Sequence, residues 1–211
     1  MDVFSYLTIE KPSEGAYREK GSKFLAFAFP VESAAEIKER LTGLKRQYYD
    51  ARHYCFAWIL GPEKKNHRVF DDREPNHSAG DPIIGQIRSR ELTNILVVVV
   101  RYFGGTKLGV GGLATAYKTA AEEALKAARI VEREVVESFI LRYDYPATAE
   151  VMRVVKDFDL QLLQQDFSDH CSMQGRIALR RSEKFKERIA LMNAMGVAVD
   201  LALSSGHPTD L

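Results

Sequence analysis

The chain has 211 residues, a formal net charge of +1, 45% hydrophobic residues and 28% charged residues. These proportions are typical of a globular protein with a sizeable core, and they exclude a disordered chain. The near-neutral charge excludes a uniformly basic protein that coats nucleic acid, so any nucleic-acid contact must come from a local patch. No apolar run approaches the ~20 residues of a spanning helix, and no secretory leader is visible. We therefore expect a cytoplasmic location and no contact with membranes.

The first part of the chain predicts two strands followed by a helix. Residues 4–9 and 24–29 have the composition and alternation of short strands, and the second strand places two phenylalanines on one face. Ser33 and Glu36 then form a capping box, and apolar residues at helical spacing follow it. We interpret this helix as support for the core.

The next strand, expected within residues 50–60, carries two side chains that could suggest nucleophilic catalysis. Alternation places His53 and Cys55 on the same face. A cysteine nucleophile also needs an orienting group and an oxyanion hole, and the sequence shows neither. We therefore interpret Cys55 and the second cysteine, Cys171, as free, buried thiols, with a disulfide between them as the alternative.

The segment after this strand is rich in potential metal ligands. Asp71, Asp72, Glu74, His77 and Asp81 lie within eleven residues, and carboxylate and imidazole groups are ligands of divalent metals. No EF-hand, H-E-x-x-H or C-x-x-C spacing is present, so we interpret these residues as solvated loop charges and expect no metal or other cofactor. A short helix is expected to begin at Asp81.

The stretch from Asn94 to Arg129 is the one around which the rest of the chain is organised. Residues 95–100 form an unbroken run of aliphatic side chains, which predicts a central strand buried on both faces. From Leu113 onward, apolar residues recur every three or four positions. This spacing predicts an amphipathic helix with a narrow face lined by alanine.

The connection between this strand and this helix is rich in glycine. Glycines allow positive φ angles and close approach, and a helix N-terminus attracts anions such as phosphate. The spacing matches neither G-x-x-x-x-G-K-S/T nor G-x-G-x-x-G, so no known nucleotide-binding loop can be assigned. Two interpretations remain open: an anion-binding loop, or a tight turn that lets the helix pack on its own strand. In both we expect the backbone geometry to require Gly105 and Gly111. The connection contains Gly104, Gly105, Thr106, Lys107, Gly109, Gly111 and Gly112.

Three separated motifs resemble those of the IMPACT/YigZ family and occur in the family's order. They are D-A-R-H-Y-C-F-A-W at residues 50–58, D-D-R-E-P at residues 71–75 and R-Y-F-G-G-T-K-L-G-V-G-G-L-x-x-A-Y at residues 101–117. The resemblance extends from about residue 20 to residue 129, and it implies a fold like that of ribosomal protein S5 domain 2. It also implies a second domain similar to one of elongation factor G.

The same resemblance implies a role in translation and no active site. The eukaryotic relatives regulate translation by interfering with activation of a kinase that senses amino-acid starvation, and no catalytic residues are established for the family. The second motif departs from the usual family pattern, because Arg73, His77 and Ser78 replace Gly, Gly and Thr. We expect a different local backbone there, since Arg and His lack the conformational freedom of glycine.

After residue 132 the pattern becomes that of a second domain. Strands are expected at 135–145, 160–167, 170–179 and 197–203, and helices at 146–158 and 182–195. Pro146 and Ser182 mark the two helix starts, and Gly196 marks the second helix end. Residues 168–169 form the expected hairpin turn between the middle strands.

These patterns together predict an α+β protein with two domains. Residues 1–132 are expected to form an S5-domain-2-like α/β sandwich, and residues 133–211 a ferredoxin-like βαββαβ domain.

We predict a non-catalytic, translation-associated protein that binds RNA, the ribosome or a translation factor. One alternative is an enzyme that binds phosphate or a nucleotide with the Gly104–Gly112 loop and holds magnesium with its acidic residues, because S5-like folds also occur in a family of small-molecule kinases. The other is an adaptor that binds only proteins. The expected binding residues combine cations, an aromatic ring and the glycine loop: Arg101, Tyr102, Gly104, Gly105, Thr106, Lys107, Gly109, Gly111, Gly112 and Lys118, with His53, Asp71, Asp72 and Glu74 as further candidates.

Overall fold

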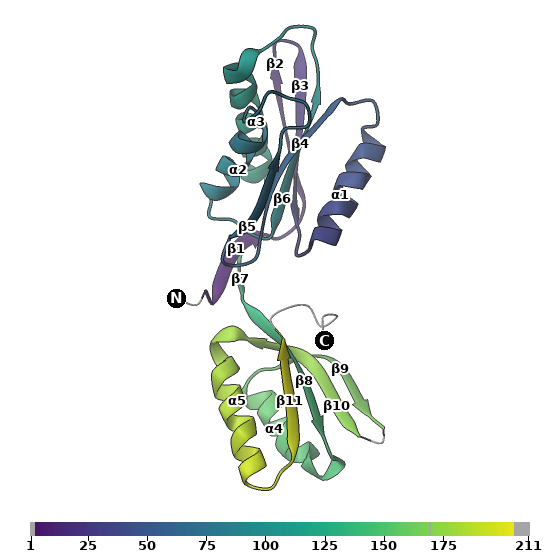
Figure 1. Cartoon of the computed structure of the whole chain (residues 1–211), viewed down its shortest axis with the longest axis vertical. Coiled ribbons are helices and arrows are strands. Elements are labelled where there is room, and N and C mark those ends of the chain that lie inside the picture. The colour runs from purple at the N-terminus through teal and green to yellow at the C-terminus, as the bar shows by residue number, and fades with distance from the viewer. Residues whose placement is uncertain (1–2, 169, 205–211) are drawn as a thin grey trace. The chain divides into compact units, whose positions relative to one another are not determined.

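The computed structural model describes residues 3–168 and 170–204, which form two compact units (Figure 1). One unit comprises residues 5–133, and the other comprises residues 134–204 together with Val3 and Phe4. Each unit combines a main antiparallel sheet with helices, so the chain has the predicted α+β fold. None of the helices formed by the described residues is long and apolar enough to span a bilayer.

The N-terminal unit is built on a five-stranded antiparallel sheet in the order β2-β3-β6-β4-β5. Its strands are β2 (Ser13–Glu19), β3 (Ser22–Pro30), β4 (His53–Leu60), β5 (Asn66–Phe70) and β6 (Ile95–Tyr102). The central strand is β6, and the side chains from Ile95 to Val100 are fully buried, as their aliphatic run predicts. A separate two-stranded sheet pairs β1 (Ser5–Ile9) with β7 (Ile130–Glu134).

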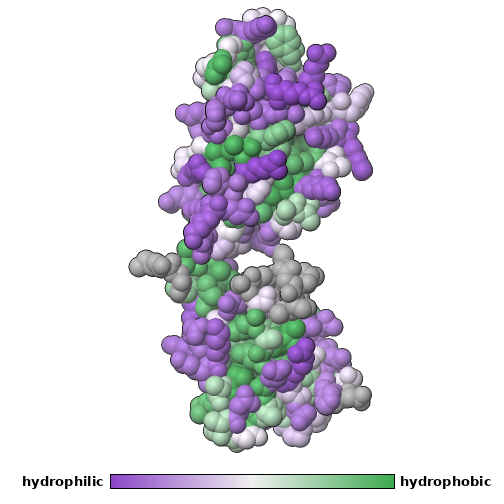
Figure 2. Space-filling model, in the orientation of Figure 1, coloured by the Kyte–Doolittle hydropathy of each residue, from purple (hydrophilic) through white to green (hydrophobic). Residues whose placement is uncertain are grey.

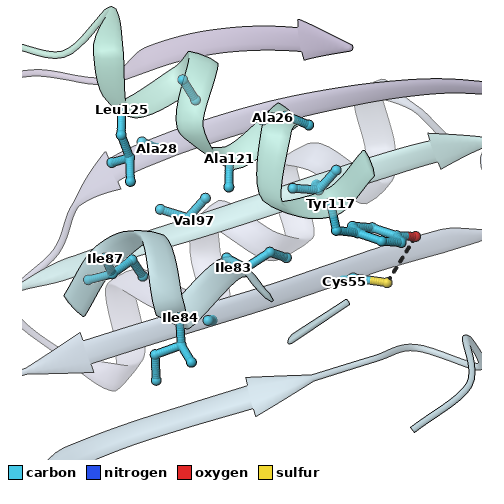
Figure 3. Close-up of a cluster of buried hydrophobic side chains, with 14 of the residues drawn as sticks. Ala26, Ala28, Cys55, Ile83, Ile84, Ile87, Val97, Tyr117, Ala121 and Leu125 are labelled. Atoms are coloured by element: carbon cyan, nitrogen blue, oxygen red, sulfur yellow. Dashed lines mark hydrogen bonds between the residues drawn. The ribbon is translucent and has the colours of Figure 1, made fainter. Parts of the chain in front are cut away.

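Helices cover both faces of the five-stranded sheet. Val97 and Val98 point to opposite faces because side chains alternate along a strand. α1 (Ala34–Gln47) packs on the face of Val98. Ser33 is its N-cap, as predicted, and accepts the N–H of Glu36, while the Glu36 carboxylate accepts the N–H of Glu32, one residue before the cap. α2 (Gly80–Arg88) and α3 (Gly109–Lys126) pack on the face of Val97, where Figure 3 shows their apolar side chains meeting above the sheet.

The alanine face of α3 brings the helix close to the backbone of the sheet. Ala120, Ala121 and Ala124 are fully buried. A Cβ atom added to Gly15 of β2 would lie 2.3 Å from the backbone nitrogen of Ala124, so the helix crosses β2 where the strand has no side chain. One of the two interpretations of the sequence had this helix packing on the strand that precedes it, and the structure adds β2 as a close partner.

The C-terminal unit has the predicted ferredoxin-like arrangement. Its antiparallel sheet has the order β11-β8-β10-β9, and helices α4 and α5 contribute to a core on one face of the sheet (Figure 1). The elements are β8 (Val136–Tyr143), η1 (Tyr145–Ala147), α4 (Thr148–Asp157), β9 (Gln161–Phe167), β10 (Cys171–Ala178), α5 (Leu179–Ala194) and β11 (Val199–Ser204).

At the ends of α5, one predicted helix boundary is confirmed and the other is wrong. Gly196 follows α5 with a φ of 86°, as expected for a residue that ends a helix. Ser182 is not the N-cap of α5, because the helix begins at Leu179. Ser182 is instead buried, and its hydroxyl donates to the Glu137 carboxylate, a tertiary partner that sequence spacing does not reveal. The predicted hairpin turn includes Asp169, which lies outside the described residues.

Candidate functional site

The three sequence motifs meet around a buried ion pair at one end of the N-terminal sheet. Arg101 of β6 is only 5% exposed, and its Nη1 donates to Glu74 Oε1 at 2.6 Å. The Tyr117 hydroxyl of α3 donates to the same oxygen at 2.8 Å. The Cys55 Sγ of β4 lies 3.3 Å from the Tyr117 hydroxyl oxygen (Figure 3) and 3.0 Å from the Asp71 carbonyl oxygen, so its single S–H is shared between these two acceptors. This polar network links the sheet, α3 and the second motif.

Burial fixes the protonation state of two groups in this network. Desolvation is the main cause that raises the pKa of the Cys55 thiol and the pKa of the Tyr117 hydroxyl, and the Glu74 carboxylate raises both further. Cys55 therefore stays protonated and lacks the thiolate that a nucleophile needs. His53 is not among the hydrogen-bond partners of Cys55 in the described part of the chain, and its Nδ1–H donates to the Asp72 carbonyl at 2.9 Å. Cys55 and Cys171 are both free and buried, as predicted.

The acidic second motif is bound to backbone groups. The Asp71 carboxylate accepts three backbone N–H groups at 2.8 to 3.0 Å, including that of Gly80 at the start of α2. The Asp72 carboxylate accepts the N–H of Tyr54 at 2.7 Å. The interpretation of Asp71, Asp72 and Glu74 as solvated loop charges is therefore wrong. No cluster of three or more potential metal ligands occurs among the described residues.

Two residues that depart from the family pattern have backbone angles typical of glycine. Arg73 has a φ of 69° and His77 a φ of 66°. A side chain in this left-handed region costs about 1–2 kcal/mol. The expectation that Arg and His change the backbone away from glycine-like angles is thus wrong, because the hydrogen bonds of Asp71 hold the loop in this conformation.

The glycine-rich connection contains a tight turn followed by the first turn of α3. A Cβ atom added to Gly104 would lie 1.9 Å from the carbonyl carbon of Gly21, which lies in the turn between β2 and β3. Gly105 has a φ of 88°, which favours glycine. α3 begins at Gly109, earlier than the sequence indicated, so Gly111 is helical and has open space around its Cβ position. The expectation that the backbone requires glycine at Gly111 is therefore wrong.

Three exposed cations belong to these two turns or flank them. Lys20 precedes Gly21 and Lys107 lies in the glycine-rich connection, whereas Lys23 follows the first turn and points, like its register partner Tyr102, to the sheet face that carries α1. All three lysines are exposed, and none forms an ion pair with another residue in the described part of the chain. Phe103, which directly precedes Gly104, is 52% exposed. We call Lys20, Phe103, Lys107 and the first turn of α3 the glycine-loop patch.

A cavity of about 350 Å³ borders this patch. Leu108, Leu113 and Phe103 supply apolar lining, and Lys107 supplies a cation at the same cavity. Its lining therefore combines an apolar surface, the Arg101–Glu74 ion pair and the further cation of Lys107.

Three other predicted binding residues have different environments. Arg101 is enclosed in its ion pair with Glu74, since an arginine at the end of a buried strand must be neutralised. Tyr102 is half-buried and donates to Asp50 at 2.7 Å. Lys118 is exposed on α3, well beyond its first turn. The sequence analysis did not include Lys20 among the candidates, because only the contact between two distant glycines brings its turn to the loop.

Residues 20–125, which contain all three motifs, match the sequence model of the Impact N-terminal domain. The chain belongs to the IMPACT family. It is 28% identical over 185 residues to IMPACT family member YvyE of Bacillus subtilis, an alignment that covers 88% of this chain and 85% of that protein. It is 26% identical over 173 residues to IMPACT family member YigZ of Escherichia coli, covering 81% and 85%. The predicted resemblance is confirmed.

A solved structure shows the same fold over nearly the whole chain. A crystal structure of a hypothetical protein superposes with a TM-score of 0.73, covering 94% of this chain and 96% of that one. The sequence identity is 24%, so this likeness concerns the fold alone.

Proposed function

We propose that this IMPACT family protein is a cytoplasmic, non-catalytic regulator of translation that binds exposed RNA of the translation machinery through the glycine-loop patch. The observation that carries the proposal is the close approach of two turns that carry the exposed cations Lys20 and Lys107 and the exposed ring of Phe103. Lysines and a helix N-terminus attract phosphates, and an exposed aromatic ring stacks on an unpaired base. The translational role of eukaryotic family members supplies the cellular context.

The environment of the polar motif residues supports a non-catalytic role. Burial keeps Cys55 and Tyr117 protonated, and Asp71 and Asp72 accept hydrogen bonds from the backbone. A phosphate-transferring enzyme would need free carboxylates to hold magnesium beside the phosphates. In this chain those carboxylates stabilise the second motif.

Filter binding of short single-stranded RNAs across a salt series tests the proposal. We expect weak binding that falls as salt rises, because a few lysines contact the phosphates. Lys107→Ala should weaken binding to all sequences alike and reduce the salt slope by about 0.7 for one lost phosphate contact. Lys184→Ala is the matched control, since it removes the same charge from an exposed position on α5 of the other unit.

Two results would count against the proposal. Absence of RNA binding by the parent protein at low salt would remove RNA as the ligand and favour a protein partner. RNA binding that is unchanged by both Lys107→Ala and Lys20→Ala would show that the RNA contacts another surface.

A further inference from the structure

A groove of about 340 Å³ lies on the sheet face that carries α1, the face opposite α3. Phe56 and Trp58 of β4 form its floor, and Leu41 of α1 and Arg68 of β5 lie along its sides. β5 is the edge strand of the five-stranded sheet, and α1 packs nearer the centre of the sheet. An open channel therefore remains between α1 and β5. We call it the α1–β5 groove.

The charges that line the α1–β5 groove are all positive. Lys38 and Lys45 come from α1, and Arg68 lies opposite Trp58 in the register of β4 and β5. All three cations are exposed, no carboxylate lines the groove, and none of the three forms an ion pair within the described ranges. An isolated surface lysine is ordinary, but three cations around one channel in a chain of net charge +1 create a local positive potential. An anionic ligand fits this potential.

The floor of the groove continues as an aromatic strip toward the end of β5. Trp58 is half-buried, and Phe70 is 39% exposed. The rings of Phe56 and Phe70 lie 5.2 Å apart, with Phe56 and Phe70 paired across the two strands. Figure 2 shows hydrophobic residues at the surface of the N-terminal unit bordered by hydrophilic ones. Aromatic rings beside cations are the combination with which proteins hold single-stranded nucleic acid.

We infer that the α1–β5 groove is a second contact surface for single-stranded RNA, in which a base stacks on Trp58 while Lys38, Lys45 and Arg68 contact phosphates. The choice of RNA rests on the proposed function, whereas the surface is separate from the glycine-loop patch and lies on the other side of the sheet. Base stacking and phosphate contacts carry little sequence information, so this surface accepts RNA of varied sequence.

The single tryptophan of the chain makes this inference directly testable, because all tryptophan emission comes from Trp58. Titration with a short oligouridylate at low salt should quench this emission in parallel with RNA binding. Arg68→Ala together with Lys45→Ala should weaken RNA binding and reduce the salt slope by about 0.7 per lost phosphate contact. Loss of stacking in Trp58→Ala should weaken binding by about tenfold or more. Lys184→Ala, on α5 of the other unit, should leave the quenching unchanged.

If Trp58→Ala fails to fold, the Arg68→Ala and Lys45→Ala variant still tests the inference, because both substitutions are at exposed positions. One result is RNA that binds in the filter assay without quenching Trp58 emission and with the same affinity for the parent and the double cation variant. This result would contradict RNA binding in the α1–β5 groove and would leave the proposed function intact. Stronger quenching by polyglutamate than by RNA overturns the inference in favour of an acidic protein partner. Complete absence of RNA binding overturns both the groove and the proposed function.

Discussion

The ion pair between Arg101 and Glu74 is almost wholly removed from water, with side-chain exposures of 6% and 4%. Removing two charges from water costs free energy, which their mutual attraction and added hydrogen bonds must offset. Tyr117 donates one such bond to Glu74, while the Arg101 Nε is buried without a hydrogen-bond partner among the described residues. The stability of the protein therefore depends on the presence of both Arg101 and Glu74.

Arg101→Met tests this dependence. We expect a loss of about 3–5 kcal/mol in the free energy of unfolding, because Glu74 remains buried without its counter-charge. Urea denaturation followed by circular dichroism measures the change. Replacing Glu74 by Leu in the same chain should recover much of the loss, and a single Arg101→Met variant as stable as the parent would contradict the account.

Arg73→Gly should make the protein more stable. Glycine adopts a φ of 69° without the steric cost of a side chain, and we expect a gain of up to about 1 kcal/mol after its greater entropy in the unfolded chain is included. Thermal melts measure the difference. Arg73→Ala is the matched control, since it removes the same charge but keeps a Cβ atom. Equal melting temperatures for the two variants would show that the backbone angle carries no strain.

At the scale of elements, the turn before α3 and the first turn of α3 use glycine for different reasons. Gly104→Ala should destabilise the protein severely, by more than about 1 kcal/mol, because its Cβ would meet the backbone of Gly21. Gly111→Ala should instead raise stability by about 0.5–1 kcal/mol, because alanine favours a helix and its Cβ meets open space. Thermal melts of the two variants measure whether their stability changes in opposite directions. A loss of stability in both variants would contradict this prediction.

The elements that the sequence predicted correctly have signals confined to neighbouring residues. The aliphatic run of β6, the alanine spacing of α3 and the N-cap at Ser33 each depend on local periodicity or local hydrogen bonds. The ferredoxin-like order of the C-terminal unit follows from such elements in sequence. Local patterns therefore sufficed for the architecture.

Sequence spacing did not reveal the environment of a residue where a distant partner decides it. Arg101 looks like a surface cation until Glu74 pairs with it, and Asp71 looks solvated until the segment 77–80, which leads into α2, places three N–H groups around it. Lys20 reaches the glycine-loop patch only because Gly21 contacts Gly104. None of these pairings has a signal in residue spacing.

At the scale of the whole molecule, each unit has its own core. Phe139, Met173 and Phe185 belong to a buried cluster formed entirely by the C-terminal unit. An isolated fragment of residues 133–211 should therefore be soluble and unfold cooperatively. Urea denaturation of the fragment measures this, and a fragment that stays unfolded where the full chain is folded would contradict the assignment of an independent domain.

The central claim is that RNA binds at the glycine-loop patch, and amide chemical-shift mapping of the isotope-labelled full chain tests it most directly. Addition of a short oligouridylate at low salt should shift the backbone signals of residues 20–23 and 103–112, and added salt should reverse these shifts as the phosphate contacts weaken. Shifts that leave both segments untouched while RNA is bound, or a spectrum that RNA does not change at low salt, would contradict the account.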